Sequence, residues 1–90
     1  MVTVKFTSAL KRFYPNLTDT QVMEGSVASI VQQLSRTYPG IDSFLLEDDG
    51  SLRKHVNIFI KEELINDRVS LSDEVGADQE VLIFQALSGG

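Results

Sequence analysis

The residues of this chain that could do chemistry are few, and the most distinctive ones lie at its end. The last three residues are Ser88, Gly89 and Gly90. The α-carboxyl group of a terminal residue has a pKa of roughly 3.5, so it is ionised at neutral pH and available as a nucleophile. With glycine at about 7% of residues, a Gly-Gly ending arises by chance in about 0.5% of chains. A truncated chain is the alternative explanation for this ending.

Reactive side chains are scarce elsewhere in the sequence. The 90 residues include no cysteine and one histidine, His55. The absence of cysteine excludes disulfides and thiolate catalysis, and it fits a reducing cytoplasm. His55 has no nucleophile or carboxylate at a defined spacing, which favours a surface strand residue over a catalytic base. No P-loop, dinucleotide or zinc motif is present. The sequence therefore offers no set of side chains that is suited to general acid–base catalysis or to holding a metal or cofactor.

Composition and charge narrow the classes of partner. Eight basic residues against thirteen acidic ones give a net charge of -5, which argues against nucleic acid or an anionic membrane as a partner. The charge suits docking on a basic protein surface, although most acidic surfaces are simply solvated, which is the default explanation. No apolar run is long enough for a membrane span, and the first residues alternate rather than forming a signal peptide.

The first half of the chain predicts a hairpin followed by a helix. Residues 2–7 alternate, with Val2, Val4 and Phe6 on one face of a strand. A turn at residues 14–16 and a short strand at 20–24 complete the hairpin. Ser26 is placed to cap a helix that ends near Tyr38, before Pro39. The apolar stripe of this helix consists of Val27, Ile30, Val31 and Leu34. Residues 41–46 predict a short extra turn, and residues 47–50 a polar turn.

The second half predicts three more strands. Residues 55–61 alternate, which places Val56, Ile58 and Ile60 on one face and Phe59 on the other. A tight turn at 62–63 leads to a short strand at 64–65. Residues 66–79 predict a loop whose inward-pointing residues are Val69, Leu71 and Val75. Residues 80–87 are the most apolar segment and predict a central strand.

These elements predict an α+β fold. One amphipathic helix among several strands implies a mixed four- to five-stranded sheet with the helix packed on one face. Residues 1–87 would form this single domain, and residues 88–90 a flexible tail.

Three stretches of the sequence resemble a known family. The first is the ending from Glu80 to Gly90 (EVLIFQALSGG), together with the turn ADQEV that leads into it. The second is the strand HVNIFIK, and the third is the helix start GSV. All three are similar to those of the ThiS/MoaD-type sulfur carriers. Two details differ: Gln85-Ala86 stands where prolines are common, and Ala77 stands where a glycine is common. The resemblance covers nearly the whole chain and implies a ubiquitin-like β-grasp fold.

The resemblance also implies a function. In such carriers an E1-like enzyme of the MoeB/ThiF type uses ATP to adenylate the last glycine, here Gly90, with Gly89 beside it. A sulfur donor, either sulfide or a sulfurtransferase, then displaces AMP and leaves a thiocarboxylate. That sulfur passes to a downstream biosynthetic synthase. In some relatives a metalloprotease first trims residues that follow Gly-Gly. The two glycines would let a narrow channel of the partner close around the backbone.

A docking surface follows from the alternation of the strands. Val81 and Ile83 should face the helix, so Leu82 and Phe84 should face outward. If the third and fifth strands are neighbours, as in a β-grasp sheet, then Phe59, Leu82 and Phe84, with Leu87 beyond them, form an apolar patch beside the tail. Lys5 and Lys61 would lie at its rim. Exposed apolar patches often mark protein interfaces.

Three other functions remain open at this point. The chain could be a ubiquitin-like modifier that is conjugated to lysines through Gly90. It could be the small subunit of molybdopterin synthase, which is a special case of the carrier. It could also be a β-grasp interaction module with an inert tail, whose binding would survive the loss of Gly90.

Overall fold

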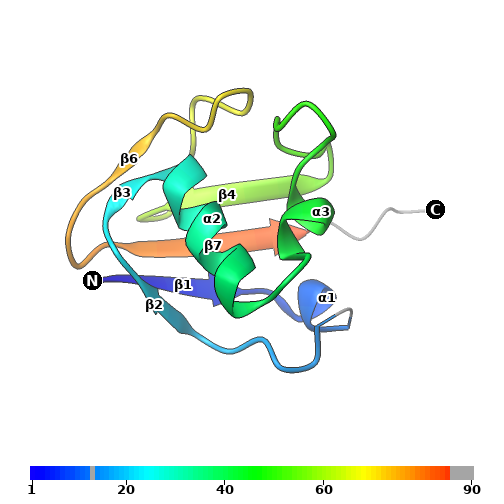
Figure 1. Ribbon diagram of the computed structural model, residues 1–90. Helices are drawn as coiled ribbons and strands as arrows, with labels where there is room; N and C mark the ends of the chain where they lie inside the picture. The colour runs from blue at the N-terminus through cyan, green and yellow to red at the C-terminus, as the bar shows by residue number, and fades with distance from the viewer. Residues whose placement is uncertain (13, 86–90) are drawn as a thin grey trace.

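The computed structural model describes residues 1–12 and 14–85, which form one mixed sheet covered by helices on one face (Figure 1). The sheet has five strands in the order β2-β1-β7-β4-β5. Their bounds are β1 Val2–Phe6, β2 Thr20–Val22, β4 Val56–Ile60, β5 Glu63–Leu64 and β7 Glu80–Gln85. The predicted α+β fold, with a mixed sheet and one main helix, is confirmed.

The central strand is β7, as its apolar sequence predicts. It runs parallel to β1, with Val81 beside Val4, and antiparallel to β4, with Ile83 beside Ile58. The first and last strands of the chain, β1 and β7, therefore lie side by side inside the sheet, and β2 and β5 form its edges. The predicted strand at residues 80–87 is described as far as Gln85. The predicted domain boundary after residue 87 lies outside the described residues and stays a prediction.

One face of the sheet is closed by helix α2, Val27–Thr37, which crosses the sheet in Figure 1. Ser26 caps this helix, because its Oγ accepts a hydrogen bond from the backbone N–H of Ser29 at 3.2 Å. The helix stops at Tyr38 because Pro39 follows. All four residues of the predicted apolar stripe are buried: Val27, Ile30, Val31 and Leu34. They pack with the inward residues of β1, β4 and β7 into one core.

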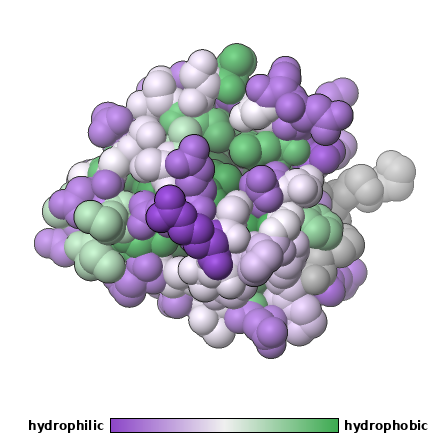
Figure 2. Space-filling model, viewed as in Figure 1, coloured by the Kyte–Doolittle hydropathy of each residue, from purple (hydrophilic) through white to green (hydrophobic). Residues whose placement is uncertain are grey.

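Two short helices complete this layer. Helix α3, Ile41–Leu45, confirms the extra turn predicted after the main helix, and it buries Ile41 and Leu45. Helix α1, Ser8–Lys11, was not predicted, and it buries Leu10 at the end of β1. From the helix side the surface is a mosaic of hydrophilic and neutral residues with small apolar patches between them (Figure 2).

The hairpin between β4 and β5 corrects one predicted boundary. The turn consists of Lys61 and Glu62, with φ values of 51° and 72°, rather than residues 62–63. Strand β5 is accordingly Glu63–Leu64 instead of residues 64–65. Two positive φ values in succession are typical of a type I′ turn, which usually contains asparagine and glycine. Lysine and glutamate give no such signal, so the sequence misplaced the turn by one residue.

The segment predicted as a loop over residues 66–79 contains a strand. Strand β6, Glu74–Val75, pairs with β3, Gly25–Ser26, in a separate two-stranded sheet. Leu71 and Val75 are buried as predicted, but Val69 is 71% exposed, so its predicted inward position was wrong. Val69 lies on a turn that is closed by Asp67, whose carboxylate accepts hydrogen bonds from the backbone N–H groups of Val69 and Ser70. This turn points the residue outward.

The hydrogen bonds to the Asp67 carboxylate give a testable prediction about its pKa. A hydrogen bond from the Ser72 hydroxyl, together with backbone N–H donors, lowers the pKa of Asp67 from 3.8 to about 2. Because the folded-state pKa is depressed, the stabilisation from this loop is present above pH 3.8 and is lost as the pH falls through about 2. Carboxyl-detected NMR should give this midpoint in the native chain, and Ser72→Ala should move it upward. A native midpoint near 3.8 would contradict the hydrogen-bonded loop.

Candidate functional site

The face of the sheet opposite α2 carries the predicted apolar residues. Register partners across neighbouring strands share a face, and Phe59 of β4 lies beside Leu82 of β7. Phe84 follows on the same side of β7 and is 39% exposed, whereas Phe59 and Leu82 are half-buried. The structure thus brings together three of the four predicted patch residues. The fourth, Leu87, lies outside the described residues, as do Gly89 and Gly90.

The apolar row extends further than the sequence indicated. Leu64 of β5 is the register partner of Phe59 and is 53% exposed. Leu64, Phe59 and Leu82 therefore form a row across three strands, beside Phe84. Leu64 was missed because its face depends on the Lys61-Glu62 turn. These four residues, Leu64, Phe59, Leu82 and Phe84, are called the apolar row.

Part of this surface is hollowed. Phe59, Leu82 and Phe84 line a depression of about 450 Å³ together with Glu62 and Glu80. The lining combines three apolar side chains with two carboxylates. Such a lining is suited to a partner side chain that has an apolar stem and a polar end.

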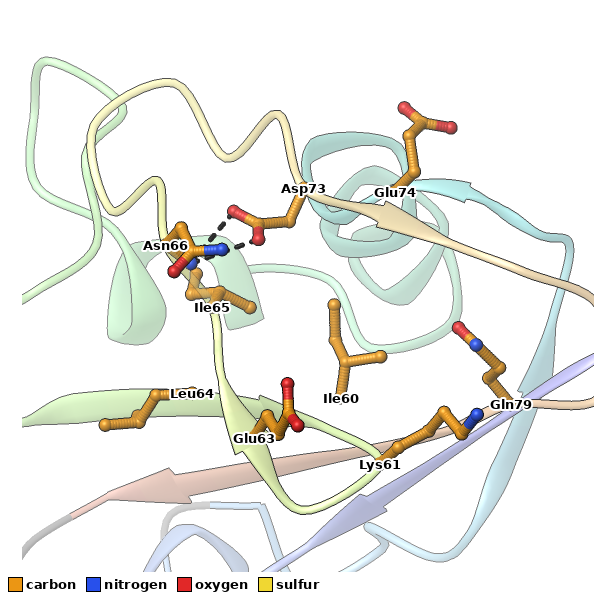
Figure 3. A pocket seen from close by; sticks show the side chains of 9 residues that line it. All are labelled: Ile60, Lys61, Glu63, Leu64, Ile65, Asn66, Asp73, Glu74 and Gln79. Carbon is orange, nitrogen blue, oxygen red and sulfur yellow. Dashed lines mark hydrogen bonds between the residues drawn. The ribbon is translucent and has the colours of Figure 1, made fainter.

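The lysines predicted at the rim have separate positions. Lys5 of β1 is the neighbour of Leu82 and forms an ion pair with Glu80, with Nζ and Oε1 3.0 Å apart. The hydrogen bond and charge of Glu80, followed by the charge of Asp19, raise the pKa of Lys5. Lys61 instead lines a different pocket, of about 350 Å³, where its side chain extends toward Gln79 (Figure 3). Lys5 thus lies beside the apolar row, as predicted for the rim, whereas Lys61 lines the other pocket and not the hollow.

The pocket of Figure 3 lies between the β4–β5 hairpin and the segment leading to β6. Asp73 lines it, and its carboxylate accepts hydrogen bonds from the backbone N–H groups of Asn66, at 3.0 and 3.1 Å, and Asp67, at 2.8 Å. Its carboxylate is thus used to shape the loop. Within residues 1–12 and 14–85 there is no group of three or more histidine, cysteine, aspartate or glutamate residues that could hold a metal ion.

An arginine fixes the end of the sheet next to Phe84. Arg68 donates hydrogen bonds to the carbonyl oxygens of Arg53 and Val56, both at 2.8 Å, and to Oδ1 of Asn57 at 3.0 Å. Asn57 is the register partner of Phe84. The loop at residues 66–73 is thereby tied to the start of β4. The sequence contained no signal for this contact, because it joins a strand to a loop eleven residues away.

His55 immediately precedes β4 and is exposed. This position agrees with the surface role that the sequence favoured. Among the described residues, no helix is long and apolar enough to cross a membrane.

Comparisons with known proteins bear on this arrangement. The model of the ThiS family matches residues 4–90. No curated protein matches the chain. Among solved structures, CysO in the BexX/CysO complex of Amycolatopsis orientalis is similar, with a TM-score of 0.84, 20% identity and 100% of both chains covered.

Two further structures share the fold. CysO of Mycobacterium tuberculosis has a TM-score of 0.82 and 21% identity, covering 97% of this chain and 100% of that one. SAMP1 of Haloferax volcanii has a TM-score of 0.78 and 23% identity, covering 99% of this chain and 98% of that one. The ubiquitin-like β-grasp fold is therefore confirmed. Because the family model covers nearly all of the sequence, the chain belongs to the ThiS family, within the ThiS/MoaD-type ubiquitin-like sulfur carriers.

Proposed function

We propose that this chain is a sulfur carrier whose Gly90 carboxylate is adenylated by an E1-like enzyme and converted to a thiocarboxylate. The observation that carries the proposal is the family match, which runs through to residue 90 and so includes Gly89 and Gly90. The exposed apolar row supports it, because a carrier must bind its activating enzyme. The chain acts as a protein co-substrate and not as an enzyme.

The chemistry needs two substitutions. A carboxylate oxygen of Gly90 attacks the α-phosphorus of ATP, and pyrophosphate leaves. Sulfide, free or released by a sulfurtransferase, then attacks the acyl carbon, AMP leaves, and the C-terminus becomes a thiocarboxylate. The adenylate step divides a difficult replacement of oxygen by sulfur into two easier ones. ATP, the activating enzyme and the sulfide or sulfurtransferase donor come from the partner system.

The fold contributes a rigid handle. Strand β7 is the central strand, and its end is held by β1 as far as Ile83 and by β4 as far as Gln85, the register partner of Val56. Five residues follow Gln85, and a chain of that length spans at most roughly 17 Å. A partner bound at the apolar row must therefore hold ATP within that distance of the strand end. The docking surface and the reacting carboxylate belong to one site in this account.

The thiocarboxylate then passes its sulfur to a downstream synthase that makes a cofactor, an amino acid or a small-molecule thiocarboxylate. The protein works in the cytoplasm. A chain without cysteine forms no disulfides and therefore does not need an oxidising compartment. A metalloprotease would be required only for a form extended beyond Gly90.

The first step is tested by ATP–pyrophosphate exchange. An E1-like enzyme of the MoeB/ThiF type should incorporate labelled pyrophosphate into ATP only when this chain is added, because exchange requires the Gly90 adenylate. The control is the enzyme with a chain that carries a C-terminal amide, which has no carboxylate to activate. Exchange at the same rate with the amidated chain would contradict the proposal.

A second candidate is a protein modifier conjugated through Gly90. It is favoured by the similarity to SAMP1, a structure from the same organism being described as a small archaeal modifier protein. Carrier and modifier share the adenylate and differ in the acceptor, which is a sulfur nucleophile for one and a lysine amine for the other. A Gly90–lysine isopeptide found by mass spectrometry would establish the modifier.

A further inference from the structure

The hollow on the open face has features that select one kind of partner side chain. Its lining combines three apolar side chains, Phe59, Leu82 and Phe84, with two carboxylates, Glu62 and Glu80. An apolar side chain alone would match the first three residues and leave the two carboxylates beside a desolvated interface, which is unfavourable. The occupant must therefore combine an apolar stem with a positive charge.

The charges around the hollow leave room for one cation. Glu80 is paired with Lys5 at 3.0 Å. The carboxylate of Glu62 has no ion pair or hydrogen bond among the described residues. Asp19, whose charge also raises the pKa of Lys5, adds negative charge near the Lys5–Glu80 pair. An arriving cation could therefore pair with Glu62 and would reduce the negative charge at the hollow.

The position of Glu62 is maintained at a conformational cost. Lys61 and Glu62 both have positive φ values, at 51° and 72°, which residues other than glycine and asparagine seldom adopt. As a result of this turn, the side chains of Lys61 and Glu63 line the pocket of Figure 3. Glu62, between them in the sequence, lines the hollow instead. Strained backbone that positions one side chain is typical of binding sites.

We propose that the hollow receives an arginine side chain of the protein partner. This assignment rests on the carrier function proposed above, in which that partner is the activating enzyme. A guanidinium group can form two parallel hydrogen bonds with a carboxylate and can stack on an aromatic ring. The methylene stem of arginine would cover Leu82. A second copy docked hollow to hollow does not fit, because it would bring two further carboxylates against Glu62 and Glu80.

The proposal is tested by titrating the labelled full chain with N-acetyl-arginine amide and, as the uncharged isostere, N-acetyl-citrulline amide. Arginine amide should give saturable NMR shift changes at residues 59, 62, 82 and 84, with a Kd of about millimolar order. Citrulline amide should bind at least about tenfold more weakly, since it lacks the charge. Equal binding of the two compounds, or shift changes confined to other surfaces, would overturn the proposal.

Two variants control for general charge. Glu62→Gln should weaken arginine amide binding about tenfold, a loss of one charge-assisted contact. Glu63→Gln makes the same change one residue along, outside the hollow, and should leave the binding unchanged. Equal effects of the two variants would show that only net charge matters and would refute the hollow as the site.

The titration contains neither enzyme nor ATP, so it separates this inference from the carrier function. A chain that supports pyrophosphate exchange but does not bind arginine amide keeps its function and loses the arginine site. A chain that binds arginine amide in the hollow but is never activated keeps the site, and its assignment to an activating enzyme is then refuted.

Discussion

Deletion of Gly90 is expected to reduce ATP–pyrophosphate exchange by at least about 100-fold. The reason is geometric, because the reacting carboxylate would move back by one residue, or roughly 3.5 Å. A nucleophile must come within roughly 3–3.5 Å of the atom it attacks, and a misplacement of about 1 Å can already cost about 100-fold. The exchange assay with saturating enzyme measures this loss directly.

The matched control for this deletion is a chain with an internal change in the tail, Ser88→Ala, which keeps both the length and the terminal carboxylate. It should retain exchange within a few-fold. Both variants should unfold at the native urea concentration, since the deletion removes no residue of the core. Full exchange by the chain that lacks Gly90 would refute the role of this carboxylate and would favour the interaction module with an inert tail.

Removal of both aromatic rings of the hollow is the second large effect. Phe59→Ala with Phe84→Ala should raise the KM of the activating enzyme for this chain by about 100-fold or more, because truncation of an aromatic interface anchor costs about 2 kcal/mol or more. The turnover number should change little, because neither phenylalanine carries a group that takes part in the two substitutions. Steady-state exchange at varied chain concentration gives both constants.

The control pair for this variant uses apolar residues that are at least as exposed but lie off the apolar row. Met23 is 64% exposed and Val69 is 71% exposed. Met23→Ala with Val69→Ala should leave KM within about twofold, as truncation outside an interface has little effect. A similar rise of KM in both double variants would contradict docking at the apolar row. A loss of turnover at unchanged KM would assign the aromatic rings to catalysis instead.

The elements that the sequence predicted well are those whose side chains repeat on one face. Val2, Val4 and Phe6 alternate along β1, and all three are buried in the structure. The stripe of α2 follows the helical period, and Ser26 and Pro39 mark its two ends. In these segments local propensity and core packing favour the same structure. The outward positions of Phe59 and Phe84 follow from the same alternation.

The elements that the sequence missed depend on contacts between distant segments. The type I′ turn at Lys61-Glu62 has no asparagine or glycine to announce it, and Leu71 takes a positive φ of 55° while its side chain is buried. The pairing of β3 with β6 joins residues about fifty positions apart in two-residue strands, which are too short to show alternation. Leu64 and Glu62 join the site only through that turn. The hollow is therefore a tertiary feature: its three apolar residues were predicted from the alternation of the strands, but the position of Glu62 beside them was not.

The most direct test of the carrier function is the intact mass of the chain after incubation with an E1-like activating enzyme, ATP and a sulfide source. The account predicts a mass gain equal to the exchange of one oxygen for sulfur, located in the C-terminal fragment that contains Gly90. The gain should be absent without ATP and in the chain that lacks Gly90. An unchanged mass under conditions where the same enzyme and ATP form the Gly90 adenylate would contradict the sulfur carrier, and it would direct attention to amine acceptors.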